Sequence, residues 1–224
     1  MRQSPQAAAG AGPYRRGMSL RKNFSAAMYD RMLRKSEEAG LSTMRQRLIA
    51  DAGGSVLEIG AGTGANLAHY DGELESLVVT EPEPAMLRRL QRKVREEAPL
   101  AKVLRAPAED LPFEDATFDT VVSTLVLCGV DDQERSLREI RRVLKPGGTL
   151  LFLEHVRSDD PSLMRLQNRI NWLNRIVAHC DCNRPTLATI EAADFSVSRL
   201  EQTEIPKVPK FVRPTIVGAA VAGR

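Results

Sequence analysis

The sequence has little cysteine, little net charge and no long apolar run. Its three cysteines, Cys128, Cys180 and Cys182, cannot all pair within one chain, so reduced thiols in a cytoplasm are the simplest interpretation. A net charge of only +3 gives no reason to expect a nucleic-acid partner. No apolar stretch reaches the roughly 18 residues that a spanning helix needs. We therefore expect a cytoplasmic chain without a transmembrane segment.

The length and composition favour one globular domain. At 224 residues, with 42% hydrophobic and 27% charged residues, the chain is long enough to bury a full core. Residues 1–20 are rich in Ala, Gly, Gln and Pro and are expected to form a disordered tail before a single domain at 21–224. Met18 is an alternative natural start. Polar residues follow Arg15 and Arg16 where an export signal needs an apolar core, so we expect no export.

A glycine-rich turn after a short apolar run organises the rest of the chain. Residues 56–59 are apolar except for Glu58, and glycines follow at positions 60, 62 and 64. This pattern predicts a buried parallel strand and the turn that leaves it. Glycine has no Cβ, so a ligand can come close to the backbone there. Ala65 would also complete a dinucleotide fingerprint, so the loop alone leaves a dinucleotide and another adenosine cofactor open.

The next strand carries the residue that narrows this choice. Residues 76–80 read as a strand, and Glu81 follows it about 20 residues after the glycine loop, where a ribose-binding acid is expected. A carboxylate at the tip of the second strand of an α/β unit can accept hydrogen bonds from ribose hydroxyls. Strand and helix patterns alternate from residue 56 onward, which predicts a parallel sheet with helices on both faces.

Several motifs in register resemble the class I S-adenosylmethionine (SAM)-dependent methyltransferases. They lie at residues 56–66, 79–82, 108–113, 118–122 and 144–150, in the order and at the spacing of that family. The resemblance implies a Rossmann-like, doubly wound sheet of seven strands in the order 3-2-1-4-5-7-6. It also implies that residues 21–50 form a helical lid over the cofactor, and that residues 156–194 are the variable part on the substrate side.

The same resemblance assigns the residues that would hold SAM. The glycine turn and strand ends would contact ribose and methionine, Glu81 the ribose hydroxyls, and the segments after strands two and three the adenine. We expect Glu58, buried within strand one, to accept hydrogen bonds from amides or cofactor. The cofactor-binding candidates are Glu58, Gly60, Ala61, Gly62, Asn66, Glu81, Pro82, Met86, Ala108, Glu109, Asp110, Thr124 and Leu125.

The acceptor side offers fewer signals. His155 follows the fifth strand, at the sheet edge where ligands bind in such folds, and is the candidate general base, with a structural histidine as the alternative. Tyr29, Cys128 and Trp172 are candidate acceptor contacts, although Tyr29 and Cys128 also suit plain packing. The apolar stripe at residues 163–177 is expected to be core, with a wall of the acceptor pocket as the alternative.

One further cluster, residues 179–182, places a C-x-C motif beside a histidine. A tetrahedral metal site needs four ligands, and the sequence offers no second Cys/His pair to complete it. We therefore expect no metal.

The second half of the chain has a narrower resemblance, to the animal membrane-associated alkyl-thiol methyltransferases. The similar segments are residues 123–130, 133–135, 152–156, 182–186 and 212–218. This resemblance implies S-methylation of a small, largely apolar thiol, and it leaves peripheral membrane contact open. Alternatives are O-, C- or N-methylation of a quinone precursor, natural product or phospholipid headgroup, and a non-catalytic SAM-binding module. No N-P-P-Y-type motif follows strand four, so we expect a small-molecule acceptor and no nucleic acid.

Overall fold

A computed structural model describes residues 26–70 and 72–223. The expected tail at residues 1–20 therefore lies outside the described residues. The strands are β1 (Gly54–Ile59), β2 (Leu74–Thr80), β3 (Lys102–Leu104), β4 (Phe118–Thr124), β5 (Leu144–His155), β6 (Phe195–Glu204) and β7 (Pro214–Ala222). The α-helices are α1 (Ala26–Ser36), α2 (Ser42–Ile49), α3 (Pro84–Glu97), α4 (Gln133–Val143), α5 (Pro161–Ala178) and α6 (Thr186–Ala192). Short helical turns are η2 (Glu37–Leu41), η3 (Leu67–His69) and η4 (Lys210–Val212).

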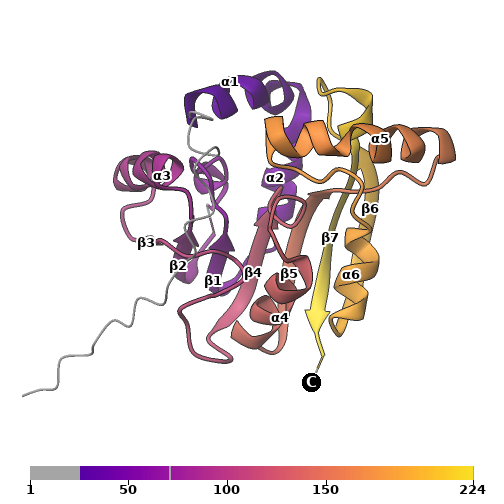
Figure 1. Ribbon diagram of the computed structural model, residues 1–224. Coiled ribbons are helices and arrows are strands. Elements are labelled where there is room, and N and C mark those ends of the chain that lie inside the picture. Colours follow the sequence, from indigo (N-terminus) through magenta and orange to yellow (C-terminus); the bar gives the residue numbers. More distant parts are fainter. Residues whose placement is uncertain (1–25, 71, 224) are drawn as a thin grey trace, which may run out of the picture.

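The strands form one sheet in the order β3-β2-β1-β4-β5-β7-β6. Strands β1 to β5 pair in parallel, whereas β7 runs antiparallel to both β5 and β6. The predicted fold class and strand order are therefore confirmed. Because the parallel strands all end at one edge, they bring the glycine loop, Glu81, Thr124 and His155 to the same edge of the sheet. Helices α1 and α5 lie above that edge (Figure 1).

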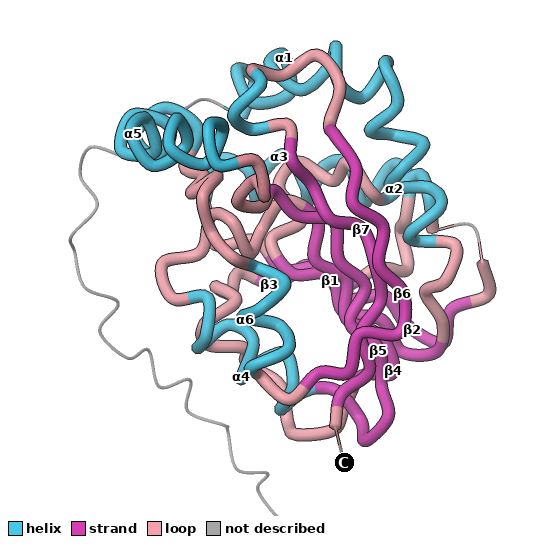
Figure 2. Tube along the Cα trace, turned by 90° about the vertical axis from the view of Figure 1, so that its right-hand side faces the viewer, coloured by secondary structure: helices cyan, strands magenta, loops and turns pink. Residues whose placement is uncertain are grey.

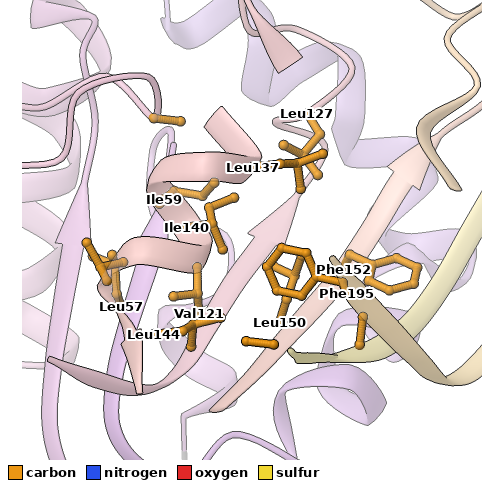
Figure 3. Close-up of a cluster of buried hydrophobic side chains, with 14 of the residues drawn as sticks. Leu57, Ile59, Val121, Leu127, Leu137, Ile140, Leu144, Leu150, Phe152 and Phe195 are labelled. Carbon is orange, nitrogen blue, oxygen red and sulfur yellow. The ribbon is translucent and has the colours of Figure 1, made fainter. Parts of the chain in front are cut away.

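Apolar side chains cover both faces of the sheet, which fixes the register of the strands. On the face covered by α4 and α6, the cluster drawn in Figure 3 packs Leu137 and Ile140 of α4 against Val121 and Leu150 of the sheet. On the opposite face, Leu48 of α2 packs in a second cluster beside β1, β4 and β5. Figure 2 shows the sheet between these two helical layers. A slip of one position would move every side chain to the opposite face, where it would meet packing partners of the wrong shape.

Two local structures shape the chain around the sheet. A single 3-10 turn, η3, follows the glycine loop. Strand β5 begins at Leu144, directly after α4, and Gly147 takes a φ of +80° within the strand. That conformation is open to glycine at little cost, so the chain turns from α4 directly into the sheet.

Helix α5 reverses the expected burial. The apolar stripe expected to be core is largely exposed, with Leu173 at 47% and Val177 at 51% relative exposure. The buried residues of α5 are polar instead: Gln167 and Asn174. The Gln167 amide nitrogen lies 2.9–3.1 Å from three backbone carbonyl oxygens, and Asn174 donates to the Cys180 carbonyl at 2.6 Å. The expectation of a core stripe was wrong because periodicity reveals an apolar face but not which face meets the protein.

Candidate functional site

The glycine loop leaves β1 through three positive φ angles, at Gly60 (+55°), Gly62 (+59°) and Gly64 (+87°). A side chain at Gly60 would overlap Val126, since its Cβ would lie 2.8 Å from both methyl carbons. A Cβ at Gly62 would meet nothing within 4 Å. The turn therefore needs glycine for its conformation, and at Gly62 it presents bare backbone to open space.

Glu81 is joined to this loop directly. Its side chain accepts a hydrogen bond from the Gly62 amide at 2.8 Å through Oε2 and from the Glu83 amide at 2.8 Å through Oε1. Burial raises the pKa of this carboxyl above its usual range, while the two amides pull it back down. Each carboxylate oxygen can accept more than one hydrogen bond, so both keep capacity for a ligand hydroxyl. The acid expected from sequence spacing is therefore held in a fixed orientation at the tip of β2.

A pocket of about 500 Å³ opens beside these groups. Among the residues expected to bind the cofactor, the pocket is lined by Gly60, Gly62, Glu81, Pro82, Met86, Ala108, Glu109 and Leu125. Sequence reasoning missed other lining residues, namely Arg105, Val126, Val130, Asp131 and His179. A larger hollow of about 840 Å³ lies by the amino ends of β4 and β5 and contains none of the expected residues. The smaller pocket is thus the one at the ligand-binding edge of the sheet.

The remaining expected cofactor residues lie outside the pocket lining. Ala61 is buried, and its amide donates to the Thr80 carbonyl at 2.8 Å. Asp110 is exposed on the loop after β3. Glu58, Asn66 and Thr124 are buried together behind the glycine loop. Glu58 accepts a hydrogen bond from the Asn66 side-chain amide, one of the two partners expected for it, and Asn66 also donates to Thr124. The expected contact of these three residues with the cofactor stays a prediction.

These three residues belong to a buried polar network that includes Arg45 of α2. Arg45 Nη1 donates to Asn66 Oδ1 at 3.0 Å and to Thr124 Oγ1 at 2.8 Å. Asn66 Nδ2 donates in turn to Thr124 Oγ1 and to Glu58 Oε1, and Tyr70 donates its hydroxyl to Glu58 Oε2 at 2.8 Å. The network ties α2 to β1, β4 and the turn after the glycine loop. Arg45 also pairs with Glu37 at 3.1 Å, but its network partners Asn66 and Thr124 are 21 and 79 residues away, so the sequence gives no local signal of the network.

Burial has a large effect on Glu58 at the centre of this network. It raises the pKa of the Glu58 carboxyl from 4.5 to about 7, against the opposing effects of the Tyr70 hydroxyl, the Arg45 charge and Asn66. Desolvation outweighs these partners because the side chain has almost no contact with water. Glu58 therefore titrates near neutral pH.

The first helix is tethered to the glycine loop through Asp30. Thr63 donates its hydroxyl to Asp30 Oδ1 at 2.6 Å, and Arg89 of α3 forms an ion pair with Oδ2 at 2.7 Å. Gly40, with a φ of +136°, marks the bend within η2 that separates α1 from α2. Helix α1 is thus placed where a lid would lie. The neighbouring Tyr29 has a side chain outside the described residues, so its expected ligand contact stays a prediction.

Glu154, one residue before the end of β5, organises the acceptor side. Its Oε1 accepts from the Ser123 hydroxyl at 2.7 Å and from the Val126 amide at 3.1 Å, while Oε2 accepts from the Cys128 amide at 3.2 Å. The carboxyl is fully buried, and desolvation raises its pKa. One side chain thus shapes the loop after β4, which forms part of the pocket wall. The sequence pointed to its neighbour His155 and missed Glu154.

His155 lies among thiols and does not line the pocket. Its Nδ1 is 3.4 Å from Cys180 Sγ and 3.8 Å from Cys128 Sγ. Its Nε2 is buried and has no hydrogen-bond partner among the described residues. The hydrogen bond to Cys180, together with burial, raises the pKa of the Cys128 thiol. All three cysteines are free and buried, as expected for Cys128.

Trp172 lies away from the pocket. It is 64% exposed on the outer side of α5 and does not line the pocket, so the structure gives no support to its expected contact with the acceptor.

The pocket fits SAM, the cofactor expected from the resemblance. The open space at Gly62 admits a ligand against bare backbone, and Glu81 is fixed beside it as a hydrogen-bond acceptor for hydroxyls. Pro82, Met86 and Ala108 supply an apolar part of the lining that suits a flat base.

Comparison with known proteins places these features in context. A family model described as a methyltransferase domain matches residues 57–152. The chain is 34% identical over 173 residues to the human thiol S-methyltransferase TMT1A, covering 75% of this chain and 70% of that protein. It is 30% identical over 153 residues to the phosphatidylethanolamine N-methyltransferase of Cereibacter sphaeroides, covering 64% of this chain and 75% of the relative.

Solved structures share the fold at lower identity. A SAM-dependent methyltransferase from Thermotoga maritima, described as a possible histamine N-methyltransferase, superposes with a TM-score of 0.67 at 22% identity. The superposition covers 92% of this chain and 98% of that structure. Within residues 26–70 and 72–223, none of the helices combines the length and the apolarity needed to cross a bilayer.

Proposed function

The chain belongs to the SAM-dependent methyltransferase family, and from this premise we propose that it transfers the methyl group to a small, largely apolar thiol. The observation that carries the proposal is the similarity to a protein named as a thiol S-methyltransferase. That similarity spans 173 residues and so extends beyond the domain match at residues 57–152 into sequence outside the common cofactor-binding motifs. Parts of the chain that vary with the acceptor are therefore included in it.

We assign the cofactor contacts from the pocket geometry. Glu81 accepts hydrogen bonds from the ribose hydroxyls, the backbone at Gly60 and Gly62 lies against ribose and methionine, and Pro82 and Met86 flank the adenine. Glu58, Asn66 and Thr124 act from behind the loop by holding its shape. SAM supplies a methyl group on a sulfonium that already carries its leaving group. The protein therefore has to align the acceptor, exclude water and assist loss of the acceptor proton.

His155 is our candidate for that last task. A free thiol has a pKa of about 8.5, so only a few per cent is ionised at pH 7. The imidazole lies at hydrogen-bonding range of a thiol in this structure, 3.4 Å from Cys180 Sγ. A thiol acceptor that reached the same ring would lose its proton to it or be stabilised by it as thiolate.

The test compares wild type with His155→Ala on an alkyl thiol and on matched alcohol and amine analogues, across pH. We expect the thiol alone to be methylated and the variant to lose up to about 100-fold in turnover, the low end of general-base effects. The loss shrinks at high pH, where the thiol ionises unaided. SAM affinity, measured by calorimetry, stays near the wild-type value. Methylation of the alcohol or amine without the thiol contradicts the acceptor assignment.

A second candidate acceptor is a phospholipid headgroup amine. It is favoured by the 30% identity to the Cereibacter sphaeroides enzyme, which is named for phosphatidylethanolamine. The amine arm of the same experiment distinguishes the two candidates. Failure of every acceptor, with SAM binding intact, favours a non-catalytic SAM-binding module.

We further propose a cytoplasmic location. The three free, buried thiols suit a reducing compartment.

A further inference from the structure

Three metal-binding side chains from separate parts of the chain converge at the acceptor side. Cys128 comes from the loop after β4, His155 ends β5, and Cys180 follows α5. Their ligand atoms, two sulfurs and one imidazole nitrogen, all lie within 4.8 Å of one another. The sequence argument against a metal looked for a partner to the C-x-C motif and found none. The fold supplies those partners from 25 and 52 residues away, so the premise of that argument fails.

The distances from the imidazole nitrogen to the two sulfurs match those of a tetrahedral zinc site. Zinc binds cysteine sulfur at about 2.3 Å and histidine nitrogen at about 2.0–2.1 Å, which places sulfur and nitrogen about 3.6 Å apart at a tetrahedral angle. The observed distances from His155 Nδ1 are 3.4 Å to Cys180 Sγ and 3.8 Å to Cys128 Sγ. Both distances lie about 0.2 Å from the tetrahedral value, and the whole set lies within 4.8 Å, so an ion between the three atoms can contact all of them after side-chain adjustment.

The backbone around these ligands is held in place. The Asp181 amide donates to the Cys128 carbonyl at 2.8 Å, which joins the two cysteine-bearing loops. Glu154 accepts from the Cys128 amide, and Asn174 donates to the Cys180 carbonyl at 2.6 Å. The second cysteine of the C-x-C motif is directed elsewhere, since Cys182 Sγ donates to Asn171 Oδ1 at 3.6 Å. These hydrogen bonds hold the backbone of both cysteines in position before any ion binds.

We propose that Cys128, His155 and Cys180 form a zinc site with one open coordination position. Both cysteines bind as thiolates and release their protons to solvent, and two thiolates with a neutral imidazole balance the charge of a divalent ion. Cysteine and histidine ligands in tetrahedral geometry select zinc over magnesium or calcium. Sites with three protein ligands keep the fourth position for water or substrate.

The open position is where the acceptor sulfur binds, a step that rests on the proposed thiol methylation. Val126 and Gly129, which lie two residues before and one residue after Cys128, line the pocket, as do Ala178 and His179, which precede Cys180. The zinc site therefore adjoins the pocket. A thiol that coordinates zinc gives up its proton to solvent. The acceptor thiolate then forms a bond to the methyl carbon as that carbon's bond to the sulfonium sulfur breaks, leaving a methyl thioether and S-adenosylhomocysteine. With zinc bound, His155 acts as a ligand that positions the metal, and the metal takes over the thiol deprotonation that a free imidazole would assist.

The experiment loads the full chain with Zn²⁺ and then with Co²⁺ under reducing conditions. We expect one ion per chain, and thiolate-to-cobalt charge-transfer absorption with tetrahedral d–d bands. Cys128→Ser, Cys180→Ser and His155→Ala lose the stoichiometric ion, whereas the matched control Cys182→Ser keeps it. Calorimetric SAM binding verifies that each variant is folded. If a variant fails to fold, mass-spectrometric mapping of alkylated cysteines in wild type decides: added zinc should slow the alkylation of Cys128 and Cys180 and leave the rate at Cys182 unchanged.

Several results overturn the proposal. Reduced wild type that takes up no stoichiometric ion, or equal loss of the ion in Cys182→Ser, refutes the site. A cobalt spectrum that does not change when an alkyl thiol is added refutes the open position for the acceptor. Equal thiol methylation by metal-free protein refutes the role of the metal but leaves the proposed function standing. Failure to methylate any thiol refutes the proposed function. The cobalt spectrum then still shows whether the three residues bind a metal ion, because it does not depend on methylation.

Discussion

Glu58→Gln isolates the titration of one buried carboxyl. Burial raises its pKa from 4.5 to about 7, so between these values the folded chain holds a proton that the unfolded chain has released. Stability from this group is fully present below about pH 4.5 and is lost as pH rises through about 7. At about 1.4 kcal/mol per tenfold change in the ionisation constant, the loss amounts to about 3 kcal/mol. Glutamine cannot titrate, so the variant lacks this pH-dependent contribution to the free energy of unfolding.

The assay is urea unfolding of both proteins at intervals from pH 4.5 to 8. Glu81 and Glu154 also have raised pKa values and lower the stability of both proteins in the same direction. Their effect cancels when the unfolding free energy of the variant is subtracted from that of wild type. We expect this difference to fall by about 3 kcal/mol across the interval and to be flat above pH 8. Glu75→Gln, on the exposed end of β2, is the matched control.

A difference that is independent of pH refutes the reasoning. It would mean that the Arg45 charge and the Tyr70 hydroxyl, which act against burial, keep Glu58 ionised in the folded protein. An increase with pH would show that these partners outweigh desolvation altogether.

Two further predictions concern the loop and the sheet. Glu81→Ala should weaken SAM binding by about 1–3 kcal/mol, the scale for lost charge-assisted hydrogen bonds. The control Glu75→Ala, at the far end of β2, should leave the SAM affinity measured by calorimetry unchanged. Equal affinities of the two variants would contradict the assignment of Glu81 to the ribose. Gly218→Ala should destabilise the fold by about 1–3 kcal/mol, because its Cβ would overlap the Arg199 carbonyl oxygen and lie 2.7 Å from Phe152 Cζ. Gly53→Ala, with nothing within 4 Å, is the control, and equal urea midpoints for the two would contradict the steric argument.

The sequence predicts well where structure depends on local pattern. The glycine turn and Glu81 are separated by a spacing that geometry constrains, and the structure joins them through the Gly62 amide. The strand order came from the family resemblance, because apolar runs alone do not specify which strands pair. The contact between the glycine turn and Glu81 was predictable because the two lie close in sequence. The strand order was predictable because it is common to the family.

The rest of the site depends on contacts between distant residues. Arg45 reaches Thr124 across 79 positions, and Glu154 holds amides 26 and 28 residues before it. A buried arginine in an amphipathic helix and an acid in an apolar strand look unfavourable until their partners are known. Cys128 and Cys180 likewise meet only because two loops are hydrogen-bonded. Long-range polar pairing leaves no periodic trace in one sequence.

The inverted burial of α5 has a consequence for the cooperativity of the domain. A helix held by side-chain amides to backbone carbonyls, with its apolar stripe facing out, adds little to the shared hydrophobic core. Its detachment would break a few buried hydrogen bonds and leave the sheet intact, so without a bound ion we expect it to open at a lower free energy than the sheet. Its amides should exchange with deuterium well before those of β4 and β5. The chain leaves α5 at Ala178 and His179, which line the pocket. We therefore expect local opening of α5 to limit the rates of acceptor entry and product release.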